Sequence, residues 1–216
     1  MPKNANDYQY WSKTADRFDA ATEYIAGVKT LEAAKHWLSN QLVATDVALE
    51  IGCGTGLYSG VIAERVQHLT ATDMSSEMLS KARARLQAYS NVTIESADAY
   101  QTKYAEQSFD VVFMGNVVRI VQEPVAVLRE GHRLLNAGGR LLSIDYTTRG
   151  MSGMAQLGMA MRYLSRYGLP PRTMKEYRLG ELVELVRGQE FEIQDAQVVT
   201  RETNVLCLCA IKSCVV

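Results

Sequence analysis

The chain has 216 residues, of which 47% are hydrophobic and 22% charged, and its formal net charge is -1. This length suits one domain, and this composition excludes a disordered or fibrous protein. Lysines and arginines are scattered rather than clustered, so nucleic acid is not an expected partner. No apolar run approaches the roughly 18 residues that a membrane span requires, and the N-terminus is too polar for a signal peptide. We therefore expect one cytoplasmic domain over residues 1–216.

The cysteines match no metal site. Cys53, Cys207, Cys209 and Cys214 form neither a C-x-x-C pair nor a set of zinc ligands. We expect reduced thiols and no bound metal, because the interior of the cell keeps thiols reduced. Cys207 and Cys209 alternate in a strand-like run, so they should share one face and pack as small apolar residues.

A helical flank is expected before the first strand. Apolar residues recur every three or four positions over residues 16–42, which is the period of an amphipathic helix. The flank covers residues 1–44 and includes the aromatic residues Tyr8, Tyr10, Trp11 and Phe18. These rings favour two interpretations equally, a lid over cofactor and substrate or simple packing on the sheet.

Strands and helices alternate after this flank. Short apolar runs predict strands over residues 47–51, 68–73, 92–97, 109–115 and 140–145. The intervening periodicity predicts helices over residues 57–66, 76–88 and 124–135. Gly138 and Gly139 are expected to end the third of these helices, because glycine tolerates a left-handed conformation. Such alternation is typical of parallel strands joined by crossover helices.

The last third of the chain departs from this alternation. Residues 147–172 form a long excursion, expected above the carboxyl ends of the strands on the substrate side. A helix over residues 174–186 and two β-rich runs over 191–200 and 205–211 follow, and the two runs should form an antiparallel hairpin. The sequence thus predicts an α/β fold with a doubly wound, Rossmann-like sheet of seven strands, mostly parallel, ending in that hairpin.

A glycine loop follows the first predicted strand. Gly52, Gly54 and Gly56 stand where this strand turns into a helix, and side chains there would fill the space that a ligand on the strand ends requires. Asp73 ends the second strand, 21 positions after Gly52. That spacing suits a carboxylate that accepts hydrogen bonds from a ribose diol. A helix-capping role for Asp73 and a plain surface turn at the glycines remain alternatives.

The spacing of the glycines separates the nucleotide-binding loops. The phosphate loop G-x-x-x-x-G-K-[ST] is absent. The dinucleotide motif G-x-G-x-x-G would place its third glycine at Leu57, so NAD is disfavoured but not excluded.

Five motifs occur in order over roughly residues 45–146. They are Leu49-Glu50-Ile51-Gly52-Cys53-Gly54-Thr55-Gly56, Thr72-Asp73-Met74-Ser75, Ala97-Asp98-Ala99, Phe109-Asp110-Val111-Val112 and Leu134-Leu135-Asn136-Ala137-Gly138-Gly139-Arg140-Leu141. With these motifs the chain resembles the class I S-adenosylmethionine-dependent methyltransferases, in particular the small-molecule subgroup of the ubiquinone-biosynthesis C-methyltransferases, methyltransferase type 11.

The resemblance implies S-adenosylmethionine as cofactor and S-adenosylhomocysteine as product. In this family the loop of Gly52, Cys53, Gly54 and Gly56 would lie against the methionine part of the cofactor. Glu50 would help to hold that part.

The resemblance also assigns the remaining cofactor contacts. Asp73 would bind the ribose hydroxyls and Met74 would pack on the adenine. Asp98 and Ala99 would lie at the adenine edge, with the Asp98 carboxylate accepting from the amino group. Asn116, at the end of the fourth strand, would face the methionine part.

The catalytic residue is not identified. Methyl transfer is an in-line displacement that depends mainly on position, and a base is needed only where the acceptor must lose a proton. Asp145, Tyr146, Tyr8 and Tyr10 are candidate bases by their strand-end or lid positions. Many relatives carry a histidine after the fourth strand, where this chain has Val117-Val118-Arg119-Ile120.

The expected function is therefore methyl transfer to a small molecule, with a hydrophobic or aromatic acceptor favoured by the methionines of the excursion. A non-catalytic S-adenosylmethionine-binding domain and an NAD-dependent oxidoreductase remain the alternatives. Five apolar residues of the excursion have helical spacing and would form either a pocket wall or a core-facing stripe: Met151, Met154, Leu157, Met161 and Leu164. Arg162 and Arg166 lie one turn apart on the same helix and would either meet an anionic substrate or, the favoured interpretation, form a solvated face.

Overall fold

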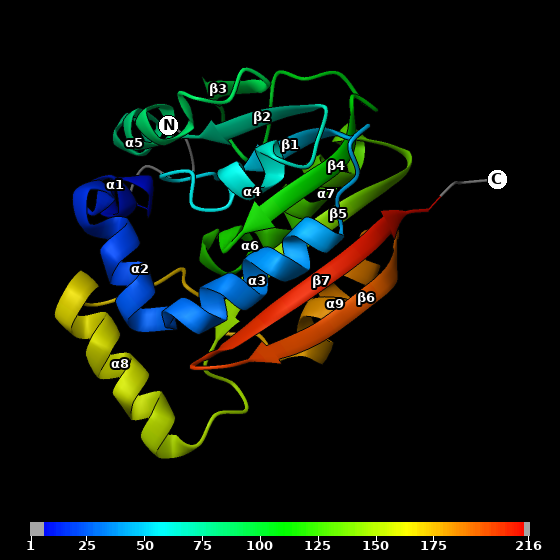
Figure 1. Ribbon diagram of the computed structural model, residues 1–216. Helices are drawn as coiled ribbons and strands as arrows, with labels where there is room; N and C mark the ends of the chain where they lie inside the picture. The colour runs from blue at the N-terminus through cyan, green and yellow to red at the C-terminus, as the bar shows by residue number, and fades with distance from the viewer. Residues whose placement is uncertain (1–6, 214–216) are drawn as a thin grey trace.

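The computed structural model describes residues 7–213. Its centre is one seven-stranded sheet in the order β3-β2-β1-β4-β5-β7-β6 (Figure 1). The strands are β1 (Val47–Ile51), β2 (His68–Asp73), β3 (Val92–Ser96), β4 (Phe109–Gly115), β5 (Leu135–Thr147), β6 (Phe191–Thr200) and β7 (Asn204–Lys212). The pairs among β1 to β5 are parallel, and β7 is antiparallel to both β5 and β6. The predicted fold, including the antiparallel C-terminal hairpin, is confirmed.

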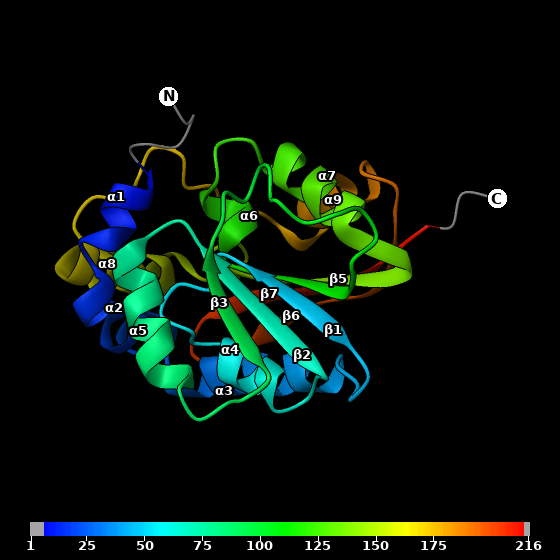
Figure 2. The ribbon, with the colours of Figure 1, turned by 90° about the horizontal axis from the view of Figure 1, so that it is seen from above.

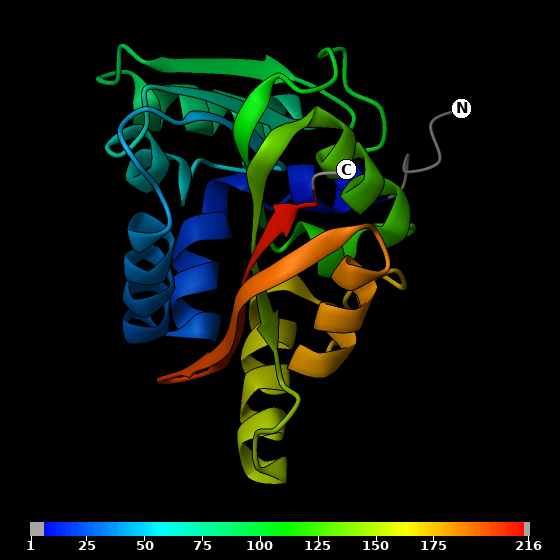
Figure 3. The same ribbon diagram turned by 90° about the vertical axis from the view of Figure 1, so that its right-hand side faces the viewer.

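Helices cover both faces of the sheet (Figures 2 and 3). The helices are α1 (Asp7–Ser12), α2 (Phe18–Ala26), α3 (Val28–Asn40), α4 (Ser59–Ala63), α5 (Ser76–Leu86), α6 (Val117–Ile120), α7 (Pro124–Leu134), α8 (Gly153–Tyr167) and α9 (Leu179–Arg187), with a 3-10 turn η1 at Ala15–Arg17. One core packs α3, α4 and α5 on the sheet through residues such as Leu38 and Ile62. The other packs α7 and α9 through residues such as Leu128 and Leu182. Because β1 and β4 are covered on both faces, they are apolar along nearly their whole length.

Between residues 7 and 213, no helix has both the length and the apolar composition needed to cross a bilayer. Cys53, Cys207 and Cys209 are buried free thiols, so the expected apolar packing of the β7 pair is confirmed. Cys214 lies outside the described residues.

Two predicted helices near the N-terminus differ from the structure. The helix expected over residues 16–42 is broken at Gly27, whose φ of 87° lies in the region that favours glycine, so α2 and α3 are separate helices. The helix expected over residues 57–66 is only α4, because residues 52–58 form the loop.

The role predicted for Gly138 and Gly139 is wrong. Helix α7 ends at Leu134, and Leu135 is already extended, so no left-handed glycine terminates it. Gly138 has φ 73° within an irregularity of β5, where the pairing with β4 shifts between Phe109 and Val111.

The helix predicted from residue 174 begins later, at Leu179. The carboxylate of Glu181 accepts the N–H of Arg178 at 2.8 Å, which fixes this start. Lys175 instead donates its backbone N–H to the carbonyl of Arg119 at 2.6 Å, so residues 174–178 run along α6.

The N-terminal helices and α8 pack together beyond the carboxyl ends of the parallel strands (Figure 1). The hydroxyl groups of Tyr10 and Tyr163 lie 3.1 Å apart, and Tyr10 also donates to the carbonyl of Tyr167 at 3.1 Å. The Trp11 ring meets the rings of Phe18 and Tyr167 edge-on. We call this assembly of α1, α2 and α8 the cap.

Both interpretations of the apolar stripe in the excursion are wrong. Met154, Leu157, Met161 and Leu164 are exposed, so they form neither a core-facing stripe nor the wall of an interior pocket. The opposite side of α8 contacts the cap through Met159 and Tyr167, which are buried. Met151, the fifth residue of the expected stripe, packs with this buried side.

Candidate cofactor site

The site lies at β1, where the order of the strands reverses. From β1 the chain continues to β2 and β3 on one side of the sheet, and then to β4 and β5 on the other. Strand β1 pairs with β2 on one side and β4 on the other, both in parallel, and chain connections on either side of it run to opposite faces. In doubly wound sheets the carboxyl ends of two such strands leave a crevice that binds ligands. The glycine loop follows β1 and Asn116 follows β4, so both lie at this switch point.

Asp73 connects the end of β2 to the glycine loop. Its Oδ2 accepts the backbone N–H of Gly54 at 2.9 Å, and its Oδ1 accepts that of Ser75 at 2.9 Å. Helix α5 is capped by Ser75, whose hydroxyl accepts the N–H of Met78 at 3.2 Å, so Asp73 is not the capping residue. Burial raises the pKa of the Asp73 carboxyl, and the backbone bonds oppose this rise. Each oxygen still has a lone pair for a further donor.

The glycines of the loop serve different purposes. All three have positive φ, and a Cβ on Gly54 would meet nothing within 4 Å, so the chain leaves open space there. A Cβ on Gly52 would instead lie 2.6 Å from Cγ2 of Val117, so the space beside Gly52 is occupied by α6. Only Gly54 therefore has the free space that the sequence argument expected at every glycine.

Glu50 is a buried carboxyl inside β1. Its Oε2 accepts the hydroxyl of Ser59 at 2.5 Å, and its carbonyl accepts that of Thr72 at 2.8 Å. Burial raises the pKa of Glu50 to about 7; the bond from Ser59 lowers it and the nearby charge of Asp73 raises it. Burial also raises the pKa of the Cys53 thiol well above its usual value. Cys53 is therefore held as an unreactive thiol, which suits a packing role in the loop.

The residues expected at an adenine lie beside Asp73 along the sheet edge. The N–H of Ala97 donates to the carbonyl of Asp73 at 3.2 Å, which brings the end of β3 to the end of β2. Asp98 accepts the N–H of Tyr100 at 2.9 Å with Oδ1, and Ala99 packs against the core. Met74 is partly exposed at the same edge.

Asn116 joins the ends of β4 and β5. Its φ of 60° is left-handed, a conformation that asparagine tolerates better than most residues. Its amide oxygen accepts the N–H of Tyr146 at 3.0 Å, and its own N–H donates to the carbonyl of Ile144 at 2.7 Å.

A buried ionic cluster next to this residue was missed by the sequence reasoning. Arg119 is 9% exposed and pairs with Glu176 at 3.0 Å, while its backbone N–H donates to Asp145 at 3.2 Å. Glu176 also accepts the N–H of Thr148 at 2.7 Å. The only signal in the sequence was one arginine inside an apolar tetrapeptide.

The candidate bases differ in their pKa values. Burial raises the pKa of Asp145 to about 6, opposed by the Ser143 hydroxyl and by Arg119, so the carboxylate form exists at neutral pH. Burial raises the pKa of Tyr146 well above its usual range, and its hydroxyl lies 3.1 Å from that of Tyr58. Burial raises the pKa of Tyr10 as well. Asp145 is 1% exposed, and its two oxygens accept from the Arg119 N–H and the Ser143 hydroxyl. The side chain of Tyr8 lies outside the described residues.

The N-terminal flank contacts the glycine loop directly, which the sequence did not reveal. The hydroxyl of Thr55 donates to Oδ1 of Asp19 at 2.6 Å, and Arg85 of α5 pairs with the same carboxylate. The hydroxyl of Ser12 donates to that of Ser75 at 2.7 Å. The cap is therefore anchored on two of the loops that form the site.

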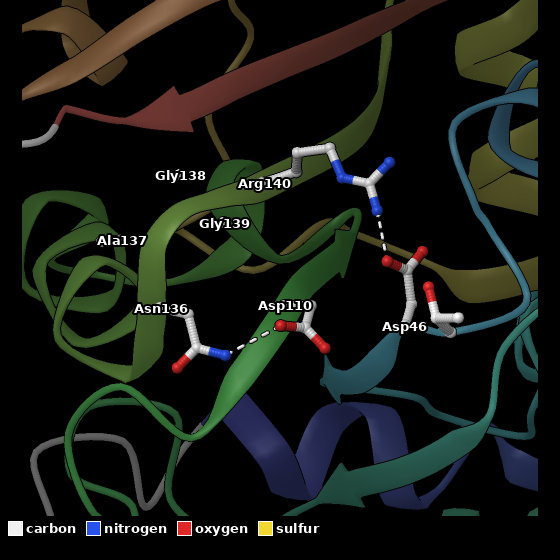
Figure 4. A pocket seen from close by; sticks show the side chains of 8 residues that line it. Asp46, Asp110, Asn136, Ala137, Gly138, Gly139 and Arg140 are labelled. Atoms are coloured by element: carbon white, nitrogen blue, oxygen red, sulfur yellow. Dashed lines mark hydrogen bonds and ion pairs between the residues drawn. The ribbon is translucent and has the colours of Figure 1, made fainter.

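The surface pocket of Figure 4 lies at the other end of the sheet. It has a volume of about 440 Å³ and is lined by residues such as Asp46, Asp110 and Arg140, at the amino ends of β1 and β4. Arg140 pairs with Asp46 at 2.5 Å, and Asn136 donates to Asp110 at 2.8 Å. These groups satisfy one another, and ligands of such sheets bind at the opposite, carboxyl ends. We therefore assign this pocket a structural role.

Residues 49–143, which run from β1 into β5, match the methyltransferase domain family. This segment is therefore similar to methyltransferase domains, although the match covers less than half of the chain. The predicted resemblance to methyltransferases is thereby confirmed over this segment.

Individual relatives agree with this assignment. A demethylmenaquinone methyltransferase of Clavibacter sepedonicus is 35% identical over 106 residues, which cover 49% of this chain and 43% of its own. The chain spans about half the length of the curated relatives it matches. Among solved structures, a methyltransferase of Thermotoga maritima aligns over 95% of this chain and 100% of its own, with a TM-score of 0.74 and 17% identity. A cyclase aligns over 84% of this chain and 80% of its own, with a TM-score of 0.69 and 19% identity, so these likenesses show the fold and not the reaction.

Proposed function

We propose that this chain transfers a methyl group from S-adenosylmethionine to a small, hydrophobic or aromatic acceptor in the cytoplasm, and that it has no nucleic-acid partner. The observation that carries the proposal is the bond from the Gly54 N–H to the Asp73 carboxylate at the switch point of the sheet. It holds a loop with open space beside a partly buried carboxylate, inside the segment that matches the family.

The residues present fit this cofactor. Asp73 would accept hydrogen bonds from the ribose hydroxyls with its remaining lone pairs, and the open space at Gly54 would admit the methionine part. The carboxyl of Glu50 would favour a positively charged ligand near the loop. Met74, Asp98 and Ala99 would line the adenine edge. These contacts would be completed by Gly52, Cys53, Gly56 and Asn116.

When bound, S-adenosylmethionine supplies an electrophilic methyl group on a positively charged sulfur. The protein has to orient the acceptor in line with that group and exclude water, which together account for much of the rate. The cap lies over the strand ends and is anchored to the loops by Thr55 and Ser75, so it would serve both purposes. Asp145 would take the proton of an acceptor that must lose one.

The acceptor class follows from the relatives as a proposal. The names of several relatives are demethylmenaquinone methyltransferase, which favours a quinol-type ring. Residues 147–172, together with the flank at residues 1–44, would form the acceptor side of a single domain over residues 1–216.

Two experiments test the proposal. Calorimetry with S-adenosylmethionine and with NAD separates the methyltransferase from an oxidoreductase; tight binding of NAD alone would reject our assignment. Labelled methyl transfer to a panel of quinol precursors, phenols, thiols and amines then separates an enzyme from a binding domain. Binding of the cofactor without transfer to any acceptor class would favour the non-catalytic alternative.

A further inference from the structure

The outer side of α8 displays a row of apolar side chains to solvent. Met154 is 88% exposed, Leu157 62%, Met161 58% and Leu164 46%, and Leu169 just beyond the helix is 80% exposed. Their spacing of three or four residues puts the first four on one side of the helix. We call these five residues the α8 stripe. Contiguous exposed apolar surface of this kind marks a binding surface, because isolated monomers rarely retain it.

The segment around the α8 stripe is basic. Between Asp145 and Glu176 the sequence contains no Asp or Glu, although these residues number 24 in the whole chain. The same segment contains five cations: Arg149, Arg162, Arg166, Arg172 and Lys175. Among residues 7–213, no salt bridge includes any of them.

The neighbouring helix α2 offsets this charge only in part. On α2, Asp19 is paired with Arg85, and Glu23 is exposed. Arg162 donates to the carbonyl of Tyr24 at 3.3 Å, and the guanidinium of Arg166 lies 4.6 Å from the centre of the Tyr24 ring. Both arginines are therefore held against Tyr24 of α2, on another side of α8 from the stripe.

The helix is held so that the stripe cannot turn inward. Its other side is buried in the cap through Met159 and Tyr167, and the Tyr163 hydroxyl meets that of Tyr10. In Figure 3 α8 extends beyond the rest of the fold at the lower end of the molecule, where a flat surface can reach it. The apolar stripe is therefore presented at a protruding edge, on a segment that carries cations and no carboxylates.

We propose that α8 docks this protein on an anionic phospholipid bilayer, with the α8 stripe inserted at the boundary between headgroups and acyl chains. An amphipathic helix with apolar residues on one side and arginines beside them lies in this interface, and its binding adds apolar burial to attraction by anionic lipid. A second copy of the chain is a poorer partner, because a two-fold contact through α8 would place the cations of one copy against the same cations of the other.

Sedimentation of the full chain with vesicles tests the proposal without any measurement of activity. We expect binding to vesicles of equal parts phosphatidylglycerol and phosphatidylcholine, weak binding to pure phosphatidylcholine, and release by salt. The double variant Leu157→Asp, Met161→Asp should lower the affinity for anionic vesicles at least about tenfold, since two apolar anchors become charged. Arg149→Gln should lower it about fivefold.

Val43→Asp is the matched control. Val43 is 51% exposed but lies before β1, at the opposite end of the sheet from the cap, so its replacement should leave vesicle binding unchanged. Failure of the parent chain to bind anionic vesicles, or equal binding by the double variant, would overturn the proposal. A dimer that the double variant abolishes, without vesicle binding by the parent, would identify a second copy as the occupant and overturn it too.

If the double variant does not fold, a variant labelled with a fluorescent dye on the α8 stripe tests the proposal independently. Met154→Cys combined with Cys214→Ser places a reactive thiol at an exposed position, while Cys53, Cys207 and Cys209 stay buried. A polarity-sensitive dye there should shift to shorter wavelength when anionic vesicles are added. An unchanged spectrum would mean that the stripe does not enter the bilayer.

Discussion

The backbone N–H of Gly54 and Oδ2 of Asp73 are joined by a hydrogen bond of 2.9 Å. It ties the loop after β1 to the end of β2, two segments that are 19 residues apart in the chain. Ser75 occupies the other carboxylate oxygen. The shape of the loop and the position of the carboxylate are therefore one structural unit, and a change in either should alter both.

Asp73→Ala should weaken binding of S-adenosylmethionine by about 1.5–3 kcal/mol, because charge-assisted hydrogen bonds to the ribose and to the loop are lost together. Calorimetry measures this change. Asp46→Ala is the control, since Asp46 also accepts a backbone N–H, from Val43 at 2.8 Å, but at the other end of the sheet. It should lower the melting temperature and leave the affinity intact. Equal affinity of the Asp73 variant and the parent would refute the ribose assignment.

Gly54→Ala should weaken cofactor binding by about 1–3 kcal/mol, because its methyl group enters space that the chain leaves open for the ligand. Gly138→Ala is a close control. Both glycines have positive φ, 55° and 73°, and neither has a neighbour within 4 Å of the added Cβ. Both variants should therefore lose about 1 kcal/mol of stability from backbone strain, and only the first should lose affinity. A loss of affinity in both would show that the effect is global.

Asp19→Ala should weaken cofactor binding by about 0.5–1.5 kcal/mol, because the glycine loop loses the bond from Thr55 that anchors the cap. Asp16→Ala removes a neighbouring exposed ion pair with Lys81 and touches no loop residue, so its affinity should equal that of the parent. Calorimetry and thermal melting on both variants separate the two effects. If the two variants behave alike, the contact between flank and loop has no role in binding.

Much of this architecture could be predicted from local patterns. Strands β1, β2 and β4 begin and end at the predicted residues, because short apolar runs between polar turns leave little freedom in their limits. The glycine loop and Asp73 also came from spacing alone. The surroundings of the apolar stripe on α8 were not predicted correctly. Helical periodicity identified the stripe, but periodicity does not say whether such a stripe contacts protein or solvent. Here Tyr163 and Tyr167 bury the other side.

Contacts between segments that are far apart in the sequence were not predicted either. Arg119 and Glu176 are 57 positions apart, and Thr55 and Asp19 are 36 apart. No local motif marks such a pair, since each depends on how two elements pack. The break at Gly27 was missed because one glycine inside a helical pattern is often tolerated.

Arg119→Met should lower the free energy of unfolding by about 2–4 kcal/mol, because Glu176 and Asp145 would lose their buried cation. Removing one partner of a buried pair leaves the other charge uncompensated. Arg187→Met breaks a pair with Glu184 in which both side chains are largely exposed, and it should be nearly neutral. Urea unfolding of the two variants gives the comparison. A neutral result at Arg119 would mean that the cluster is solvated in solution.

The stability of the protein should depend on pH through Glu50. Its pKa in the folded state is about 7, above the ordinary value of 4.5, because burial penalises the charged form. The folded protein therefore holds this proton more tightly than the unfolded chain does. The resulting stabilisation is complete below about pH 4.5 and is lost as the pH rises through 7. A shift of this size corresponds to about 3 kcal/mol.

Glu50→Gln should remove this dependence, because the amide does not ionise and its oxygen can still accept the Ser59 hydroxyl. Relative to the parent, the variant should lose about 2.5 kcal/mol less between pH 5 and 8 in urea unfolding. Glu184→Gln replaces a carboxylate that is 72% exposed, so it should retain the slope of the parent. The pKa of Asp145 is raised to about 6, so its ionisation also lowers the stability as the pH rises. This contribution is present in both variants. Parallel stability curves for parent and Glu50→Gln across this range would show that Glu50 is already ionised in the folded protein, and that the carboxylate near the glycine loop is solvated rather than buried.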